Sequence, residues 1–112
     1  MQILISSQKD ELSSPVDERF GRAPWLINFD TETNEWKAYQ NPGVNYSSGA
    51  GVAAAQFVID QKAEVVISGD FGPHAAKTFQ AAKIEMRLFT ENVVTVQDAI
   101  DQYQNSKLPK FQ

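Results

Sequence analysis

The sequence contains no cysteine and a single histidine. Without cysteine the chain can form no disulfide, has no thiol nucleophile, and offers no thiolate ligand for zinc or an iron–sulfur cluster. No apolar run approaches the roughly 20 residues that cross a bilayer. The first residues also lack the basic segment followed by a long apolar one that marks a secretion signal. We therefore expect a cytoplasmic protein without a membrane partner.

The chain also lacks an excess of positive charge. Its 112 residues carry a formal net charge of −4, which disfavours sequence-independent binding to nucleic acid or to an acidic membrane. We therefore expect no nucleic-acid partner. A chain of this length fits one domain with a real hydrophobic core. We expect residues 1–112 to form a single domain in which 105–112 are a polar tail.

One stretch predicts a buried strand, a turn and the start of a helix. The β-branched run at 65–67 suits a central strand covered on both faces. Gly69 and Gly72 permit backbone angles closed to other residues, and Pro73 fits the first helical position. The helix-start amides then point beyond the carboxyl end of the strand, where open α/β sheets bind ligands, and such amides favour anions. His74, the single histidine, lies in this first turn.

Hydrophobic periodicity predicts the other elements. Short or alternating apolar patterns indicate strands at 3–5, 25–30, 35–39 and 84–89, of which the second and third form a hairpin. Helical spacing indicates helices over 52–62, 73–82 and 96–103, and Thr95–Asp98 is a capping box for the last. The expected buried faces are Val52, Ala55 and Ile59 on the first helix and Ala75, Phe79 and Ala82 on the second. This order predicts an α/β fold with a five-stranded mixed sheet flanked by three helices, the ribonuclease H-like arrangement.

Two further segments are open to two interpretations. The loop at 15–24 holds Arg19 and Arg22, and it is either a solvated connector with internal ion pairs or a loop whose arginines bind an anion. Its two acidic residues oppose the second interpretation unless they point elsewhere. Gly49 and Gly51 at a helix start indicate either tight packing or close approach of a ligand. No Lys-Ser or Lys-Thr pair follows these glycines, so this is not a Walker loop.

Four segments in this order resemble the dinitrogenase iron–molybdenum cofactor-binding family, which includes NifX, NafY and the C-terminal part of NifB. They are residues 16–24, 49–54, 66–75 and 95–100. The resemblance implies a ribonuclease H-like fold and non-enzymatic binding, carriage or storage of an anionic metal–sulfur cluster. That cluster would be the iron–molybdenum cofactor or another molybdenum or iron sulfide, and a thiometallate is a related ligand. Proteins that donate or accept the cluster are possible partners.

Carried over by position, the resemblance places twelve residues at one pocket. The cofactor-binding set is Arg19, Phe20, Gly21, Arg22, Gly49, Ala50, Gly51, Gly69, Phe71, Gly72 and Pro73, with His74 as the candidate metal ligand. The chain departs from its relatives at two positions. Several nitrogen-fixation relatives have histidine where this chain has Arg19, and some have cysteine where it has Ala23. These departures favour a non-covalent site, in which guanidinium groups and helix-start amides surround an anionic cluster.

Other functions remain open. The same helix starts suit a nucleotide or another phosphorylated small molecule, because both ligands are anions. An interaction protein with a vestigial pocket would bind neither. A ribonuclease H-like nuclease is less favoured, because its carboxylates hold two Mg²⁺ ions and residues 3–7 offer no carboxylate on the first strand. Fold alone does not supply the activity.

Overall fold

A five-stranded mixed sheet forms the centre of the protein. The computed structural model describes residues 1–111, and its strands are β1 (Gln2–Ser7), β2 (Trp25–Asp30), β3 (Trp36–Gln40), β4 (Val65–Ser68) and β5 (Glu85–Leu88). The strand order is β3-β2-β1-β4-β5. The β1–β2 and β2–β3 pairs are antiparallel, whereas β1–β4 and β4–β5 are parallel. The predicted mixed sheet is confirmed, and its order fits the ribonuclease H-like arrangement.

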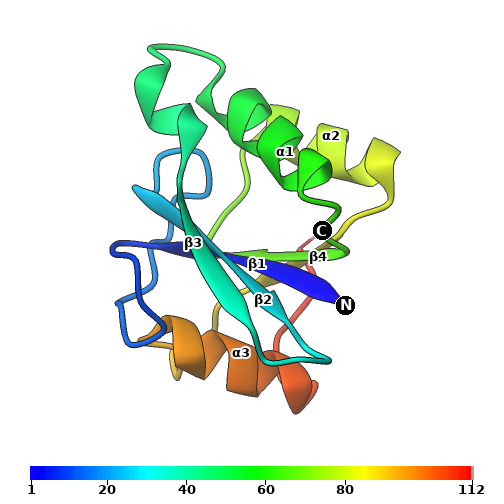
Figure 1. Cartoon of the computed structure of the whole chain (residues 1–112). Helices are drawn as coiled ribbons and strands as arrows, with labels where there is room; N and C mark the ends of the chain where they lie inside the picture. The colour runs from blue at the N-terminus through cyan, green and yellow to red at the C-terminus, as the bar shows by residue number, and fades with distance from the viewer. Residues whose placement is uncertain (112) are drawn as a thin grey trace.

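Helices cover both faces of this sheet. They are α1 (Ala50–Asp60), α2 (Pro73–Ala82) and α3 (Val96–Gln104). Figure 1 shows α1 and α2 side by side on one face and α3 on the other. The predicted α/β class with three flanking helices is therefore confirmed. None of the helices in residues 1–111 is long and apolar enough to cross a membrane.

Two buried clusters explain why the central strands are apolar on both faces. Leu4 and Val66 pack in the cluster beneath α1 and α2, together with Phe79. The neighbouring Ile5 and Ile67 point the other way and pack beneath α3. Side chains alternate between the two faces of a strand, so a strand buried on both sides must be apolar throughout.

The first two helices differ from the sequence prediction in which residues they bury. Helix α1 begins at Ala50, two residues earlier than predicted, and buries Ala50, Ala54, Ala55 and Val58. Val52, predicted to be buried, is 45% exposed. On α2, Ala82 is exposed and Ala76 is buried in its place. On α1 the physical reason is size, since this helix can approach the sheet most closely along its alanine face.

Two segments outside the predicted elements are ordered by backbone hydrogen bonds. Residues Pro42–Asn45 form a short 3₁₀ helix, η1, capped by the Asn41 side chain. The sequence predicts a polar tail at 105–112, after α3. Instead Leu108 is buried, and the N–H groups of Leu88 and Phe111 donate to the carbonyls of Pro109 and Met86 at 2.9 and 3.1 Å. The end of the described chain thus covers the β5 edge, and Gln112 lies outside the described residues.

Candidate functional site

The loop that carries both arginines is fixed to the carboxyl ends of β1 and β4. The Asp17 N–H donates to Ser6 O at 3.1 Å, and Arg19 forms a parallel bridge with Asp70. The Ser6 hydroxyl donates to Asp17 O at 2.6 Å and lies 2.7 Å from the Ser68 hydroxyl. Both serines are fully buried. Neither serine is among the predicted site residues, although each follows the apolar run of a buried strand.

Two of the predicted site glycines let backbones approach each other closely. A Cβ on Gly69 would lie 2.7 Å from both Cα and Cβ of Glu18. A Cβ on Gly21 would lie 3.0 Å from Cα and N of Gly51. Real Cβ contacts are essentially never as short as 2.7 Å, so a side chain at Gly69 would displace the loop, whereas one at Gly21 would require a smaller shift of the backbone at Gly51. Gly21 and Gly69 therefore shape the site by packing.

A hollow of about 340 Å³ lies where this loop meets the starts of α1 and α2. It is lined by Arg19, Phe20, Gly21, Arg22, Ala50, Gly51, Asp70 and Gly72. Sequence reasoning named all of these except Asp70, which stands between two glycines that it did name. The volume falls at the lower end of the range of about 300–1,000 Å³ typical of small-molecule pockets. The two helix starts therefore open on one hollow.

The two helices that begin at the hollow have free amides. Their N-cap residues, Gly49 and Gly72, supply no side-chain hydrogen bond. The first backbone bonds onto these caps are Ala53 N–H to Gly49 O at 3.0 Å and Ala76 N–H to Gly72 O at 2.9 Å. The earlier amides of each helix therefore have no intrahelical acceptor. Helix α3, away from the hollow, is instead closed by the Thr95 capping box.

Both arginines at the hollow are exposed, and both are partly engaged. Arg19 is 70% exposed, with Nε 3.5 Å from a carboxylate oxygen of the buried Asp17. Arg22 donates from Nη1 to Tyr46 O at 2.6 Å and from Nη2 to Ser47 O at 3.2 Å. A guanidinium has five N–H donors, so each retains donors for an anion.

Asp70 opposes the two arginines with one negative charge. Its carboxylate accepts the Phe71 N–H at 2.8 Å, and Asp70 also lines the hollow. The Asp17 carboxylate, by contrast, is turned into the protein and accepts the Arg19 N–H at 2.9 Å. The charge of Arg19 is therefore partly offset by Asp17, whereas Glu18 is exposed and does not belong to the lining of the hollow.

The predicted aromatic residues lie in the core. Phe20 and Phe71 are 2% and 3% exposed, with ring centroids 5.5 Å apart. Both rings also pack against Phe79, at 5.3 and 6.0 Å. Phe20 reaches the hollow as part of its lining, whereas Phe71 supports the turn from beneath. The packing of these rings thus holds the loop with Phe20 and the turn with Phe71 in place.

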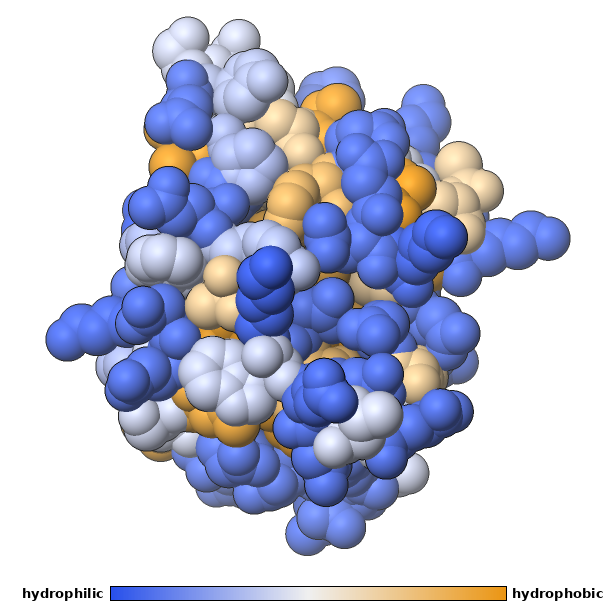
Figure 2. All heavy atoms as spheres, viewed as in Figure 1, coloured by the Kyte–Doolittle hydropathy of each residue, from blue (hydrophilic) through white to orange (hydrophobic). Residues whose placement is uncertain are grey.

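His74 lies in a neighbouring groove, and with Val52, Ile59, Lys77, Thr78, Ala81 and Ala82 it lines a space of about 580 Å³. Figure 2 shows apolar atoms at the surface over α1 and α2 in this region. Pro73 and Gly49 are exposed, and neither belongs to the lining of the hollow. Residues 1–111 hold no group of three or more His, Cys, Asp or Glu arranged for a metal ion. Metal ligation by His74 stays a prediction.

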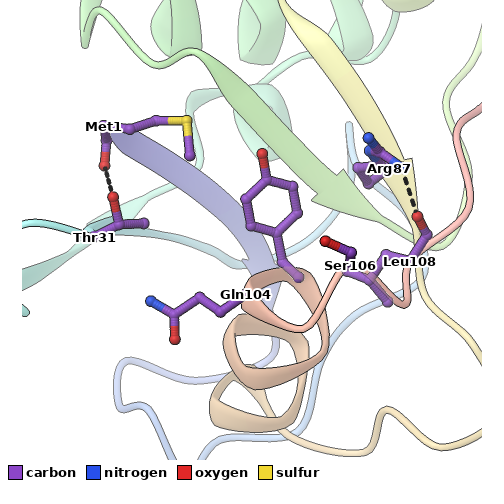
Figure 3. Close-up of a pocket in the computed structure, with 7 residues that line it drawn as sticks. Met1, Thr31, Arg87, Gln104, Ser106 and Leu108 are labelled. Carbon is purple, nitrogen blue, oxygen red and sulfur yellow. Dashed lines mark hydrogen bonds between the residues drawn. The ribbon is translucent and has the colours of Figure 1, made fainter.

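A further hollow, of about 330 Å³, lies among Met1, Thr31, Arg87, Tyr103, Gln104, Ser106 and Leu108. Figure 3 shows Arg87 turned toward the Leu108 carbonyl, to which it donates at 2.8 Å. Its Nε donates to Glu85 at 2.8 Å, and this hydrogen bond lowers the pKa of the Glu85 carboxyl. Burial, followed by the Glu85 charge, raises the pKa of Tyr103. The charge of Arg87 is thus balanced locally, and this hollow does not favour an anion.

The fold and the site together define a small α/β domain with a hollow, lined by two helix starts and two arginines, at the carboxyl ends of its central strands. The chain belongs to the dinitrogenase iron–molybdenum cofactor family, whose model matches residues 1–106. The predicted family is therefore confirmed. Comparison with curated proteins finds no match.

Solved structures with the same fold include relatives from three organisms. The apo form of the orange protein from Desulfovibrio gigas has a TM-score of 0.91 and 31% identity, covering 98% of this chain and 92% of that one. A Thermotoga protein provisionally described as NifB has a TM-score of 0.83 and 28% identity over 97% and 91% of the two chains. A protein from Methanocaldococcus jannaschii, provisionally described as a dinitrogenase, shares the fold with a TM-score of 0.72 and 18% identity over 100% and 95%.

Proposed function

We propose that the chain binds an anionic metal–sulfur cluster or a thiometallate at this hollow, as a carrier or store and without catalysing a reaction. One observation carries the proposal. Two helices without side-chain N-caps open on the same hollow, and Arg19 and Arg22 line it. Free helix amides and guanidinium groups are the donors that bind anions in proteins. Membership of the iron–molybdenum cofactor family supports a cluster as that anion.

The chemistry of the lining indicates how such a cargo would be held. With no cysteine in the chain, a sulfide cluster would keep its own ligands and be bound through hydrogen bonds and charge. The amides of α1 and α2 would face its sulfur atoms on one side, and the two guanidinium groups would face it on the other. His74, in the adjacent groove, is the candidate for a contact at the edge of a larger cluster. The cargo would be the iron–molybdenum cofactor or another molybdenum or iron sulfide.

Two other functions can be distinguished from cluster binding. A phosphorylated small molecule, such as a nucleotide, would use the same donors. A competition experiment, in which the nucleotide displaces a bound thiometallate, distinguishes the two ligands. A nuclease would need several carboxylates around two metal ions. Asp70 is the one carboxylate in the lining of the hollow, as described for residues 1–111. We therefore favour cluster binding.

The test is an anaerobic titration with tetrathiomolybdate, followed by its visible absorbance. We expect the wild-type protein to bind and Arg19→Ala to bind about tenfold or more weakly, the size expected from losing a charge-assisted hydrogen bond. His74→Ala should bind tetrathiomolybdate like wild type, because His74 lies outside the lining of the hollow, and weaker binding would show that the imidazole is a ligand. No binding by wild type would contradict the function, and equal binding by Arg19→Ala would contradict the site. Displacement of the probe by ADP at a similar concentration would favour the nucleotide alternative.

A further inference from the structure

The segment that leads into α1 is hydrogen-bonded to the loop at 15–24 through the side chain of Arg22. We call residues 44–49, which run from the last two residues of η1 to the residue before α1, the strap. The strap carries two large apolar residues at the surface, Val44 and Tyr46, which are 43% and 50% exposed. Tyr46 bonds within its own turn, from its N–H to Gly43 O at 3.1 Å. The strap ends at Gly49, whose φ of 74° lies in the left-handed region.

Arg22 joins this strap to the hollow. Its two terminal nitrogens donate to the consecutive carbonyls of Tyr46 and Ser47, at 2.6 and 3.2 Å. Arg22 also lines the hollow beside Gly51 and Gly72. The guanidinium is a planar fork with fixed geometry, so it can bridge two neighbouring acceptors in a way that lysine cannot. The Arg22 side chain therefore bonds to the strap and also lines the hollow.

We propose that Arg22 couples the loading of the hollow to the conformation of the strap. In the conformation described here the guanidinium bonds to two neutral carbonyls. A carbonyl attracts the guanidinium only through its dipole, whereas a multiply charged anion in the hollow attracts it through full negative charges. When the guanidinium turns to present its paired terminal donors to the anion, it leaves the carbonyls of Tyr46 and Ser47, and the strap is released. This inference rests on the proposed function, and it gives a donor or acceptor protein an outer surface by which to distinguish loaded from unloaded forms.

The tether itself can be tested without any ligand. Chymotrypsin cleaves after exposed aromatic residues, so cleavage after Tyr46 reports release of the strap, and cleavage after Tyr39 within β3 is an internal reference. We expect Arg22→Gln to be cleaved after Tyr46 at least about tenfold faster than wild type, from the loss of two hydrogen bonds to a charged group. Arg22→Lys keeps the charge but not the fork and should also be cleaved faster.

Arg19→Gln is the matched control, because Arg19 lines the same hollow but contacts Asp17 rather than the strap. It should be cleaved at the wild-type rate. All variants are checked for folding by their thermal unfolding. Wild-type rates after Tyr46 in both Arg22 variants would overturn the tether, whatever the hollow binds.

The coupling is tested by repeating the digestion with tetrathiomolybdate under anaerobic conditions. We expect wild-type cleavage after Tyr46 to rise toward the rate of Arg22→Gln, while cleavage after Tyr39 stays constant. Arg22→Gln itself should show little further change. Binding of the probe with unchanged or slower cleavage after Tyr46 would overturn the coupling and leave the proposed function standing. Absence of binding in the titration would overturn both.

Discussion

Substituting Gly69 by alanine should weaken both the fold and the site. The added Cβ would lie 2.7 Å from Cα and Cβ of Glu18 and 2.9 Å from its carbonyl oxygen, whereas ordinary contacts begin at 3.4 Å. The Glu18 backbone must therefore retreat by about 0.7 Å, the difference between 3.4 and 2.7 Å. Overpacking of this kind costs roughly 1–3 kcal/mol of unfolding free energy. Because Arg19 follows Glu18 directly, the displacement also moves a cation at the hollow.

The matched control is alanine at Gly72, three residues further along the same turn. Its φ of −64° suits any residue, and a Cβ there meets no atom within 4 Å. Reduced freedom of the unfolded chain favours alanine by about 0.4–1 kcal/mol, and alanine's poorer N-capping offsets a similar amount. We expect stability within about 1 kcal/mol of wild type. The methyl group lines the hollow, however, so it should obstruct a cargo that reaches the α2 amides.

Both variants are measured by urea unfolding, followed by tryptophan fluorescence, and by anaerobic titration with tetrathiomolybdate. The expected pattern separates packing from binding, because Gly69→Ala loses stability and affinity, whereas Gly72→Ala loses affinity alone. Wild-type stability of Gly69→Ala would show that the close approach to Glu18 is not a constraint. Wild-type affinity of Gly72→Ala would show that the cargo stays away from the start of α2.

Three further predictions concern the scaffold. Phe71→Ala removes a buried ring and should lower the unfolding free energy by about 3–5 kcal/mol; a loss below 1 kcal/mol in urea would contradict its packing role. Thr95→Ala should cost about 1 kcal/mol through the lost N-cap, measured in the same way. Backbone hydrogen bonds from Thr95 and Val94 lower the pKa of Asp98, and the hydrogen bond from Arg87 lowers that of Glu85. The stability that each ionised carboxylate adds to the fold is therefore complete above its ordinary pKa, 3.8 for Asp98 and 4.5 for Glu85. This stability is lost as pH falls through the lowered pKa of the folded state. Thermal unfolding of Glu85→Gln should show a weaker loss of stability on acidification than wild type.

Most of the fold could be predicted from the sequence because local signals and tertiary packing agree. The run at 65–67 forms a strand buried on both faces, and the predicted capping box at Thr95 is present. The buried face of α1 could not be predicted in this way. Its pattern fits Val52 and Ile59 as well as the alanines, and only the close approach to the sheet decides for the alanines. Likewise, Leu108 and Phe111 are isolated apolar residues in a polar stretch, so no periodicity marks their pairing with β5.

The site could be predicted as a set of segments, but the roles of its residues could not. Gly69 and Gly72 look alike in the sequence, yet one is constrained by a distant loop and the other faces open space. Such distances depend on which distant segments of the chain lie side by side, and no local sequence pattern encodes this. The placement of His74 is a similar case, because it follows Gly72 by two residues, yet Gly72 lines the hollow and His74 lines the groove. The tether from Arg22 to Tyr46 joins residues 24 positions apart.

Under the proposed function, an acidic protein could hold an anion here because backbone amides at two helix starts add to the two guanidinium groups. The net charge of −4 is spread over the whole surface and is largely screened beyond about 8 Å at physiological ionic strength. Helix amides instead donate at contact distance, do not titrate, and do not appear in any composition count. Affinity at this hollow should therefore depend on how closely a cargo approaches the starts of α1 and α2. A methyl group at Gly72 consequently tests the site more directly than a change of net charge elsewhere on the surface.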